Sequence, residues 1–336
     1  MKKILVTGGS GFIGENLINK LISENKYKVF NLDKLSYASN WKSKIPNQIS
    51  NKCHFFKVDL VNSLETKKVI DNVNPDIVIH MAAETHVDRS IKSPMDFIQS
   101  NIVGTFNLLE AVTEKWQEVY SQKREFKFIH ISTDEVFGSL DASGNFSEKT
   151  SYKPSSPYSA SKASSDHLVN AWHKTYNLPV IITNCSNNYG PGQHFEKLIP
   201  KVIINSKFGL QIPLYGNGEN IRDWIYVEDH VDALLSILEN GVIGERYCIG
   251  SNNELKNKQI VNIICSILDE KLPKSTPYRN QIEFVDDRLG HDYRYALDSS
   301  KIKSKLGWQS KTSFEEGIEK TINWYLKNAN QIKKFF

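Results

Sequence analysis

The sequence has 336 residues, of which 40% are hydrophobic and 24% charged, ordinary proportions for a globular chain with a sizeable core. The formal net charge of +4 is small for this length and excludes the basic footprint of a nucleic-acid-binding protein. No apolar run is long enough to cross a membrane, and we expect no signal peptide. The four cysteines lack metal-ligand spacing, so we expect reduced thiols, no metal site and a cytoplasmic protein.

A glycine-rich turn follows the first predicted strand, residues 3–7, and leads into an amphipathic helix that reaches about Ser23. Strand, glycine turn and helix in this order form a dinucleotide-binding pattern, because the glycines permit a tight turn and a close approach of backbone to pyrophosphate. A purely structural glycine turn is the alternative. The pattern assigns the dinucleotide to Gly8, Gly11, Phe12, Ile13 and Gly14.

The second predicted strand, residues 28–32, ends at Asp33, nineteen residues after Gly14. A carboxylate at this place accepts hydrogen bonds from a ribose 2′-hydroxyl and repels a 2′-phosphate, so NAD is favoured over NADP. We assign the neighbouring Lys34 and Ser36 to the same site.

Two further strands end in residues suited to the cofactor. Residues 55–58 lead to Asp59 and Leu60, where a carboxylate meets the adenine amino group. Residues 76–80 are followed by Ala82 and Ala83, whose small side chains let the backbone pass close to a ligand.

Strands and helices alternate over the first half of the chain, which predicts a Rossmann-type α/β fold with a doubly wound parallel sheet. We expect further strands at 128–132 and 178–183 and helices at 97–115 and 158–176, with a loop at 141–157. Later predicted elements are helices at 195–205, 228–239, 258–269, 299–306 and 313–327 and a short strand at 214–215. We therefore divide the chain into an NAD-binding domain, residues 1–190, and a smaller mixed α/β domain, residues 191–336, which mainly binds substrate. Some later segments return to the first domain.

A hydroxyl and two carboxylates, Thr133, Asp134 and Glu135, follow the strand at 128–132. Tyr158 and Lys162 lie four residues apart on the next helix and so share one face. A free tyrosine has a pKa of about 10, which an adjacent ammonium lowers, so this pair predicts a base for alcohol oxidation. The alternative is an exposed tyrosine and lysine with no catalytic role.

The adjacent carboxylates Asp134 and Glu135 repel each other, so one of them is expected to keep its proton at neutral pH. An acid and a base at one place suit the elimination of water, provided that a neighbouring carbonyl makes the carbon-bound proton acidic. Oxidation of a substrate alcohol, with Tyr158 as the base, creates that carbonyl. The alternative is a helix-capping Asp beside a solvated Glu.

Several motifs give the chain a close resemblance to the extended short-chain dehydrogenase/reductases and, within them, to the nucleotide-sugar 4,6-dehydratases, over nearly its whole length. Besides the glycine turn and the Tyr158–Lys162 pair, the resemblance is carried by residues 83–90 (AETHVDRS), 132–136 (STDEV), 186–191 (SNNYGP), 196–200 (EKLIP), 222–224 (RDW) and 288–292 (RLGHD).

The resemblance implies an NAD-dependent hydro-lyase that acts on dTDP-glucose, with UDP-glucose as the alternative. It implies that Tyr158, assisted by Lys162 and Thr133, deprotonates the C4 hydroxyl while hydride passes to NAD. Glu135 then removes the C5 proton and Asp134 protonates the departing C6 hydroxyl. The hydride returns to C6, which yields a 4-keto-6-deoxy sugar without net redox change.

The resemblance also assigns residues to the ligands and implies a homodimer joined by the helices at 97–115 and 158–176 in a four-helix interface. It assigns Asn188, Tyr158 and Lys162 to NAD. The nucleotide sugar is assigned to Glu84, Thr85, Thr133, Asn187, Lys197, Leu198, Pro213, Tyr215, Arg222, Asn253, Arg288 and His291.

Three positions depart from the family pattern: Phe137 and Leu289 replace the usual Tyr and Pro, and residues 192–195 lack the usual Tyr. These departures leave the catalytic set intact but bear on the nucleotide and sugar recognised. Two rival functions are a nucleotide-sugar 4-epimerase, which needs no Asp–Glu pair, and a catalytically silent NAD-binding scaffold.

Overall fold

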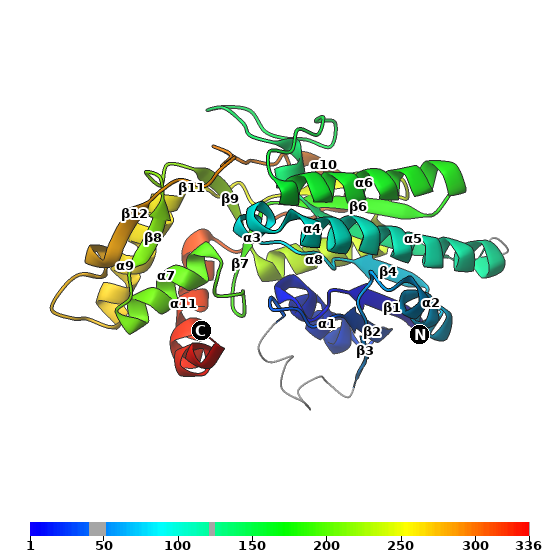
Figure 1. Ribbon diagram of the computed structural model, residues 1–336, viewed down its shortest axis with the longest axis horizontal. Coiled ribbons are helices and arrows are strands. Elements are labelled where there is room, and N and C mark those ends of the chain that lie inside the picture. Colours follow the sequence, from blue (N-terminus) through cyan, green and yellow to red (C-terminus); the bar gives the residue numbers. More distant parts are fainter. Residues whose placement is uncertain (40–51, 121–124, 336) are drawn as a thin grey trace.

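The computed structural model describes residues 1–39, 52–120 and 125–335, and within them a seven-stranded parallel sheet forms the centre of the molecule (Figure 1). The strand order is β10-β6-β5-β4-β1-β2-β3. This confirms the predicted α/β fold class. The strands are β1 (Lys2–Thr7), β2 (Tyr27–Asp33), β3 (Cys53–Lys57), β4 (Ile77–His80), β5 (Lys127–Thr133), β6 (Val180–Cys185) and β10 (Arg246–Ile249).

Helices cover both faces of this sheet. Ile4 and Val6 of β1 pack with one helical layer, whereas Leu5 between them packs with the other. Because both faces are buried, the strands are nearly continuous apolar runs, and each buried Leu or Ile stabilises the fold by about 1.5–3 kcal/mol. The first layer contains α1 (Phe12–Glu24), α8 (Val227–Asn240) and α10 (Ser300–Leu306), and the second contains α2 (Ser63–Val73), α5 (Gly104–Lys115) and α6 (Pro157–Tyr176).

The start of α6 is defined by a capping box. The Ser156 hydroxyl accepts a hydrogen bond from the Ser159 backbone N–H at 3.1 Å, and the Ser159 hydroxyl accepts one from the Ser156 N–H at 3.0 Å. Pro157 occupies the first helical position, where its missing N–H costs nothing. This start places Tyr158 in the first turn, at the edge of the sheet.

The helix expected over residues 97–115 is interrupted by a wider turn. A π-helical segment, η2 (Ile98–Val103), joins α4 (Pro94–Phe97) to α5. Asn101 of η2 is buried, and its amide donates hydrogen bonds to the Glu84 carbonyl at 3.0 Å and to the Ser161 hydroxyl at 2.8 Å. The π-helical turn therefore lies where the Asn101 side chain joins η2 to α6 through a hydrogen bond.

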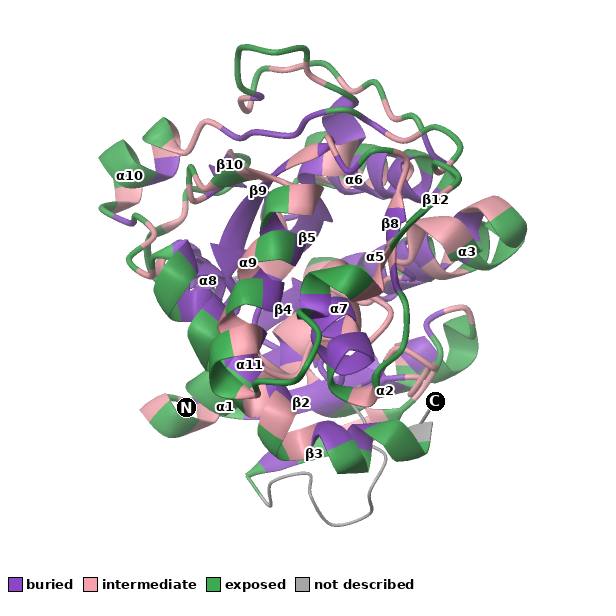
Figure 2. Cartoon of the chain, turned by 90° about the vertical axis from the view of Figure 1, so that its left-hand side faces the viewer, coloured by how far each residue is buried: buried purple, intermediate pink, exposed green. Residues whose placement is uncertain are grey.

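A second unit with its own apolar core lies at one end of the molecule (Figure 1). Figure 2 shows that the interiors of both units are buried, while the outward faces of their helices are exposed. The second unit contains α7 (Leu198–Phe208), α9 (Asn257–Lys271), α11 (Phe314–Ile332), β7 (Asn187–Tyr189), β8 (Ile212–Tyr215), β9 (Ile221–Tyr226), β11 (Glu254–Lys256) and β12 (Ile282–Val285). Short remaining elements are α3 (Val87–Lys92), η3 (Trp116–Tyr120), η4 (Asp134–Phe137), η5 (Tyr278–Gln281) and η6 (Lys333–Phe335).

The two units interleave along the chain, since α8, β10 and α10 return to the central sheet after the second unit has begun. Several expected boundaries differ by a few residues. The last helix, α11, ends at Ile332 and not at residue 327, and α7 begins at Leu198 and not at residue 195, because Lys197 has the extended backbone of an N-cap (φ −77°, ψ 154°). Among the described helices, none combines the length and apolar character needed for a membrane crossing.

Candidate active site

A cavity of about 420 Å³ lies between the carboxyl ends of the central strands and the second unit. Its lining includes Gly8 after β1, Asp33 at the end of β2, Met81 after β4, Thr133 at the end of β5 and Cys185 at the end of β6. The strand order reverses between β1 and β4, which is where ligands bind in doubly wound sheets.

The glycine turn after β1 has no room for side chains. Gly8 has φ +72°, and a Cβ added there would lie 2.6 Å from the Ala82 Cα; a Cβ on Gly14 would collide with the Gly8 carbonyl. A Cβ added to Gly11, which lines the cavity, would lie 3.3 Å from the Gly8 backbone oxygen, a tight contact. The turn therefore fits the close approach of a pyrophosphate to the start of α1.

Asp33 is buried at the edge of the cavity, and its carboxylate accepts hydrogen bonds from the Ser10 N–H at 3.0 Å and the Leu35 N–H at 2.7 Å. Burial raises the pKa of Asp33. The adjacent Lys34 pairs with Glu84, with Nζ 3.0 Å from Oε1. All the residues assigned to the cofactor line the cavity: Gly8, Gly11, Phe12, Ile13, Gly14, Asp33, Lys34, Ser36, Asp59, Leu60, Ala82, Ala83, Tyr158, Lys162 and Asn188.

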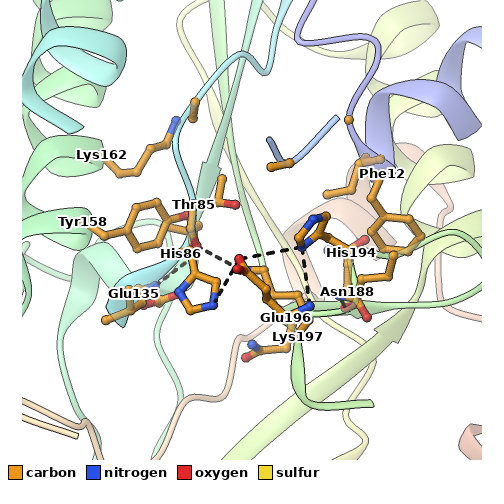
Figure 3. A pocket seen from close by; sticks show the side chains of 18 of the residues that line it. Phe12, Thr85, His86, Glu135, Tyr158, Lys162, Asn188, His194, Glu196 and Lys197 are labelled. Carbon is orange, nitrogen blue, oxygen red and sulfur yellow. Dashed lines mark hydrogen bonds and ion pairs between the residues drawn. The ribbon is translucent and has the colours of Figure 1, made fainter. Parts of the chain in front are cut away.

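The five candidate catalytic residues share this cavity. Thr133 is the N-cap of η4: its hydroxyl accepts a hydrogen bond from the Glu135 N–H at 3.3 Å and donates one to Asp134 Oδ1 at 3.1 Å. Figure 3 shows Tyr158, Lys162 and Glu135 on one side, opposite Phe12 and Asn188. Lys162 is held by a hydrogen bond of 2.9 Å from its Nζ to the Ile131 carbonyl.

Asp134 has the environment of a proton donor. Burial and the neighbouring Glu135 raise its pKa well above the ordinary range, and its Oδ2 has no hydrogen-bond partner among the described residues. Burial also raises the pKa of Glu135, but the cations Lys197 and Arg222 oppose that rise. The two carboxyl groups therefore differ in environment, as an acid and a base require.

Tyr158 differs from the sequence-based expectation. Lys162 was expected to lower the pKa of the phenol, but burial and the charge of Glu135 raise it well above its ordinary value. Burial likewise lowers the pKa of Lys162. The expectation considered only the spacing of the pair along the helix, whereas the solvation of both groups is set by packing.

The cationic residues assigned to the nucleotide sugar already have protein partners. Arg288 forms a bidentate pair with Asp88, at 2.6 Å from Nε and 3.1 Å from Nη2. Arg222 donates to the carbonyl of Asp292 at 2.9 Å, and its guanidinium lies 4.2 Å from the centre of the Tyr295 ring. Both arginines line the cavity, held in place before any ligand contact.

The structure brings most of the substrate assignments together but not all. Glu84 and Asn253 are absent from the cavity wall: Glu84 faces Lys34, and the Asn253 N–H donates to Asp223 at 2.8 Å. The assigned residues that line the cavity are Thr85, Thr133, Asn187, Lys197, Leu198, Pro213, Tyr215, Arg222, Arg288 and His291.

Sequence reasoning missed a polar cluster at the centre of the cavity (Figure 3). Glu196 Oε2 lies 3.6 Å from His86 Nε2 and 3.7 Å from His194 Nδ1, and Arg89 donates to Glu196 at 2.5 Å. Asp88, the partner of Arg288, was also missed. These residues lie in or beside motifs that carry the resemblance, but pairs so distant in sequence have no local signal.

Of the three departures from the family pattern, one reaches the cavity. Phe137 is buried against Phe146 and Tyr152, with ring centres 5.3 and 5.4 Å away, and is not part of the cavity wall. Leu289 is 74% exposed. Within residues 192–195, Gln193 and His194 line the cavity.

Comparison with known proteins agrees with this geometry. The family model described as GDP-mannose 4,6 dehydratase matches residues 5–321. A dTDP-glucose 4,6-dehydratase of Salmonella typhimurium is 51% identical, over 98% of this chain and 94% of its own.

Two solved dTDP-glucose 4,6-dehydratases with NAD bound share the fold. The Streptomyces venezuelae enzyme has a TM-score of 0.89 and 37% identity, covering 99% of this chain and 100% of its own. The Bacillus anthracis enzyme has a TM-score of 0.87 and 40% identity, covering 100% of both chains. With this identity along nearly its whole length, the chain belongs to the family of dTDP-glucose 4,6-dehydratases.

Proposed function

We propose that the protein is an NAD-dependent dTDP-glucose 4,6-dehydratase, a lyase that converts the nucleotide sugar to its 4-keto-6-deoxy form and water. The observation that carries this proposal is that Tyr158 and Lys162 share one cavity with the unequal carboxyl pair Asp134 and Glu135. Alcohol oxidation needs the first pair and elimination needs the second, and few reactions need both.

NAD would lie along the glycine turn, with Asp33 as partner of a ribose hydroxyl and with Asp59 nearby. When bound, NAD supplies the acceptor and later donor of hydride. The collisions that an added Cβ would meet at Gly8 and Gly14, and the place of Gly8, Gly11 and Gly14 in the cavity wall, support this placement.

The chain's own residues then move the protons. Tyr158 takes the C4 hydroxyl proton, with Lys162 and Thr133 stabilising the oxygen, and the resulting ketone makes the C5 proton acidic. Glu135 removes that proton while the protonated Asp134 gives its proton to the C6 hydroxyl, which leaves as water. Positioned acids and bases of this kind contribute about 10²–10⁴-fold each.

Recognition of the nucleotide sugar would fall to the cations Lys197, Arg222 and Arg288, because guanidinium and ammonium groups pair with diphosphate. UDP-glucose is the alternative substrate, since thymine and uracil differ by one methyl group, which is worth only about 1–3 kcal/mol in an apolar pocket. A 4-epimerase would need Tyr158 and Lys162 but neither carboxyl group.

Incubation with dTDP-glucose and, separately, UDP-glucose tests the function. We expect a 4-keto-6-deoxy product without added NADH, formed faster from dTDP-glucose. A 4-epimer as product would favour the epimerase, and a lack of product from every nucleoside diphosphate hexose would refute the dehydratase.

We further propose a homodimer that forms through the outer faces of α5 and α6. Aromatic side chains cover this face: Phe106 is 42% and Tyr176 41% exposed, and Trp172 lies between them with ring centres 5.9 and 5.6 Å away. An exposed apolar patch that spans two helices is typical of a protein interface.

We also place the protein in the cytoplasm. The structure has its four cysteines as buried free thiols, which suits a reducing compartment.

A further inference from the structure

Behind the Tyr158–Lys162 pair lies a second carboxyl group that the mechanism above does not use. Asp166 follows Lys162 by four residues on α6, as Lys162 follows Tyr158, so the three side chains lie along one face of the helix. Asp166 is fully buried and is not part of the cavity wall. Burying a carboxylate is strongly unfavourable unless nearby charges and hydrogen bonds offset its loss of hydration.

Three polar groups offset the loss of hydration of the buried Asp166 carboxyl group. Tyr152 donates to Oδ2 at 2.5 Å, His130 Nε2 lies 3.0 Å from Oδ1, and Arg246 Nη1 lies 3.9 Å from Oδ2. Burial lowers the pKa of His130 to about 4, so its ring is neutral at pH 7 and donates through Nε2 to the carboxylate. Two hydrogen-bond partners and one nearby guanidinium therefore surround the Asp166 carboxyl group.

The charge of Asp166 acts on Lys162. The Lys162 ammonium donates to the Ile131 carbonyl at 2.9 Å and is buried, and burial alone lowers its pKa. Asp166 is the strongest influence that opposes this loss of the proton. A neutral Lys162 would not stabilise the negative charge of the Tyr158 phenolate.

Other titratable and charged groups face the pair from each neighbouring element. Burial keeps His80 neutral, and it raises the pKa of the Cys185 thiol to about 12. The groups are His80 on β4, His130 on β5, Asp134 and Glu135 on η4, Cys185 on β6, Arg246 on β10, and Tyr158 and Asp166 on α6 itself. Among them Asp166 combines full burial, two hydrogen-bond partners, an ion pair with Arg246 and one helical turn of separation from Lys162.

We propose that Asp166 is a positioning residue for the dehydratase reaction: its buried carboxylate, held by Tyr152, His130 and Arg246, keeps Lys162 in the ammonium form that stabilises the Tyr158 phenolate. The proposal rests on the proposed function. It adds a residue that acts on the oxidation step through Lys162, without contact with substrate or cofactor.

The pH dependence of kcat in the holoenzyme tests this role. We expect loss of the Lys162 proton to set the alkaline limb of the profile, so Asp166→Asn should move that limb to lower pH by about one unit, the order of effect of a neighbouring opposite charge. The KM for dTDP-glucose should stay within about 2-fold, because Asp166 does not reach the cavity. A profile parallel to that of the wild type at every pH would overturn the proposal.

Tyr152→Phe provides the matched control. It removes one hydrogen bond to Asp166 but leaves the carboxylate, so its alkaline limb should not move to lower pH. An equal downward movement in both variants would show that the network acts through rigidity and not through charge, and would also overturn the proposal.

An NMR titration of the Lys162 ε-carbon, assigned with Lys162→Met, gives a readout independent of activity. In the wild type Lys162 should be an ammonium at neutral pH, and in Asp166→Asn it should lose its proton at lower pH. A neutral amine in the wild type would overturn the proposal even if Asp166→Asn fails to fold. Absence of product from wild-type enzyme would refute the proposed function, but it would leave this titration unaffected.

Discussion

At the scale of single residues, the site depends on one pair of like groups, the carboxyl groups of Asp134 and Glu135, placed in unlike surroundings. Asp134 has an oxygen with no hydrogen-bond partner in the described part of the chain and a strongly raised pKa, whereas the charges of Lys197 and Arg222 oppose the rise in the pKa of Glu135. The assignment of acid and base therefore comes from environment and not from residue type.

Glu135→Gln separates oxidation from elimination. The variant keeps Tyr158 and Lys162, so mixing it with dTDP-glucose should still produce the absorbance of reduced nicotinamide. Product formation should fall by about 10²–10⁴-fold, because no base removes the C5 proton. Rapid-mixing absorbance and product analysis measure the two steps, and elimination at the wild-type rate would show that the base is misassigned.

Asp134→Asn should lower activity and raise stability. The pKa of Asp134 is raised in the folded state, so between its unfolded and folded pKa values the folded chain keeps a proton that the unfolded chain has lost. The stability of the wild type therefore falls as the pH rises through this window. The Asp134→Asn variant has no carboxyl group at this position, so its stability does not fall for this reason. We expect product formation to fall by about 100-fold or more.

Thermal unfolding at about pH 4 and about pH 7 measures the stability effect, because the unfolded carboxyl group titrates near the lower value. The gain in Tm of Asp134→Asn over the wild type should be larger at the higher pH. An equal difference at both pH values would contradict the protonated state assigned to Asp134.

At the scale of elements, the site depends on where helices begin. The capping box of Ser156 and Ser159 starts α6 one residue before Tyr158, and Thr133 caps η4 directly before Asp134 and Glu135. The first turns of α6 and η4 therefore place the reactive side chains at the carboxyl edge of the sheet.

Ser156→Ala should cost about 1 kcal/mol in the free energy of unfolding, the usual effect of losing an N-cap. Because Tyr158 lies in the first turn, kcat should fall as well. Ser164→Ala on the same helix is the control: its hydroxyl donates to the Ala160 carbonyl within the helix, at 2.9 Å, and we expect a change within about 0.5 kcal/mol. Urea denaturation compares them, and equal losses would argue against a special role of the cap.

At the scale of the whole molecule, the cavity exists only where the two units meet. Ion pairs cross between them: Asp88 of α3 holds Arg288, and Arg89 holds Glu196.

Phe106→Arg should convert the proposed dimer to a monomer, because a charge placed among Trp172 and Tyr176 cannot be desolvated without large cost. Sedimentation at micromolar concentration measures the mass. Leu64→Arg, at a position that is 72% exposed on α2, is the matched control and should leave the mass unchanged. A monomeric wild type would refute the dimer.

The sequence by itself determined the order of strands and helices, the fold class and the chemistry of the reacting groups. These follow from short-range patterns, such as the glycines after β1 and the four-residue spacing of Tyr158 and Lys162, which need only local geometry. Nearly all the residues that it assigned to the site line the cavity, because they belong to motifs that lie at strand ends.

Only the tertiary structure decided the electrostatics and the partners. Burial raised the pKa of Tyr158 where helical spacing alone predicted a decrease. Packing turned Phe137 away from the cavity and placed Asp166 behind Lys162. Solvation and contacts between residues far apart in sequence are properties of the packed chain, so no local pattern could predict them.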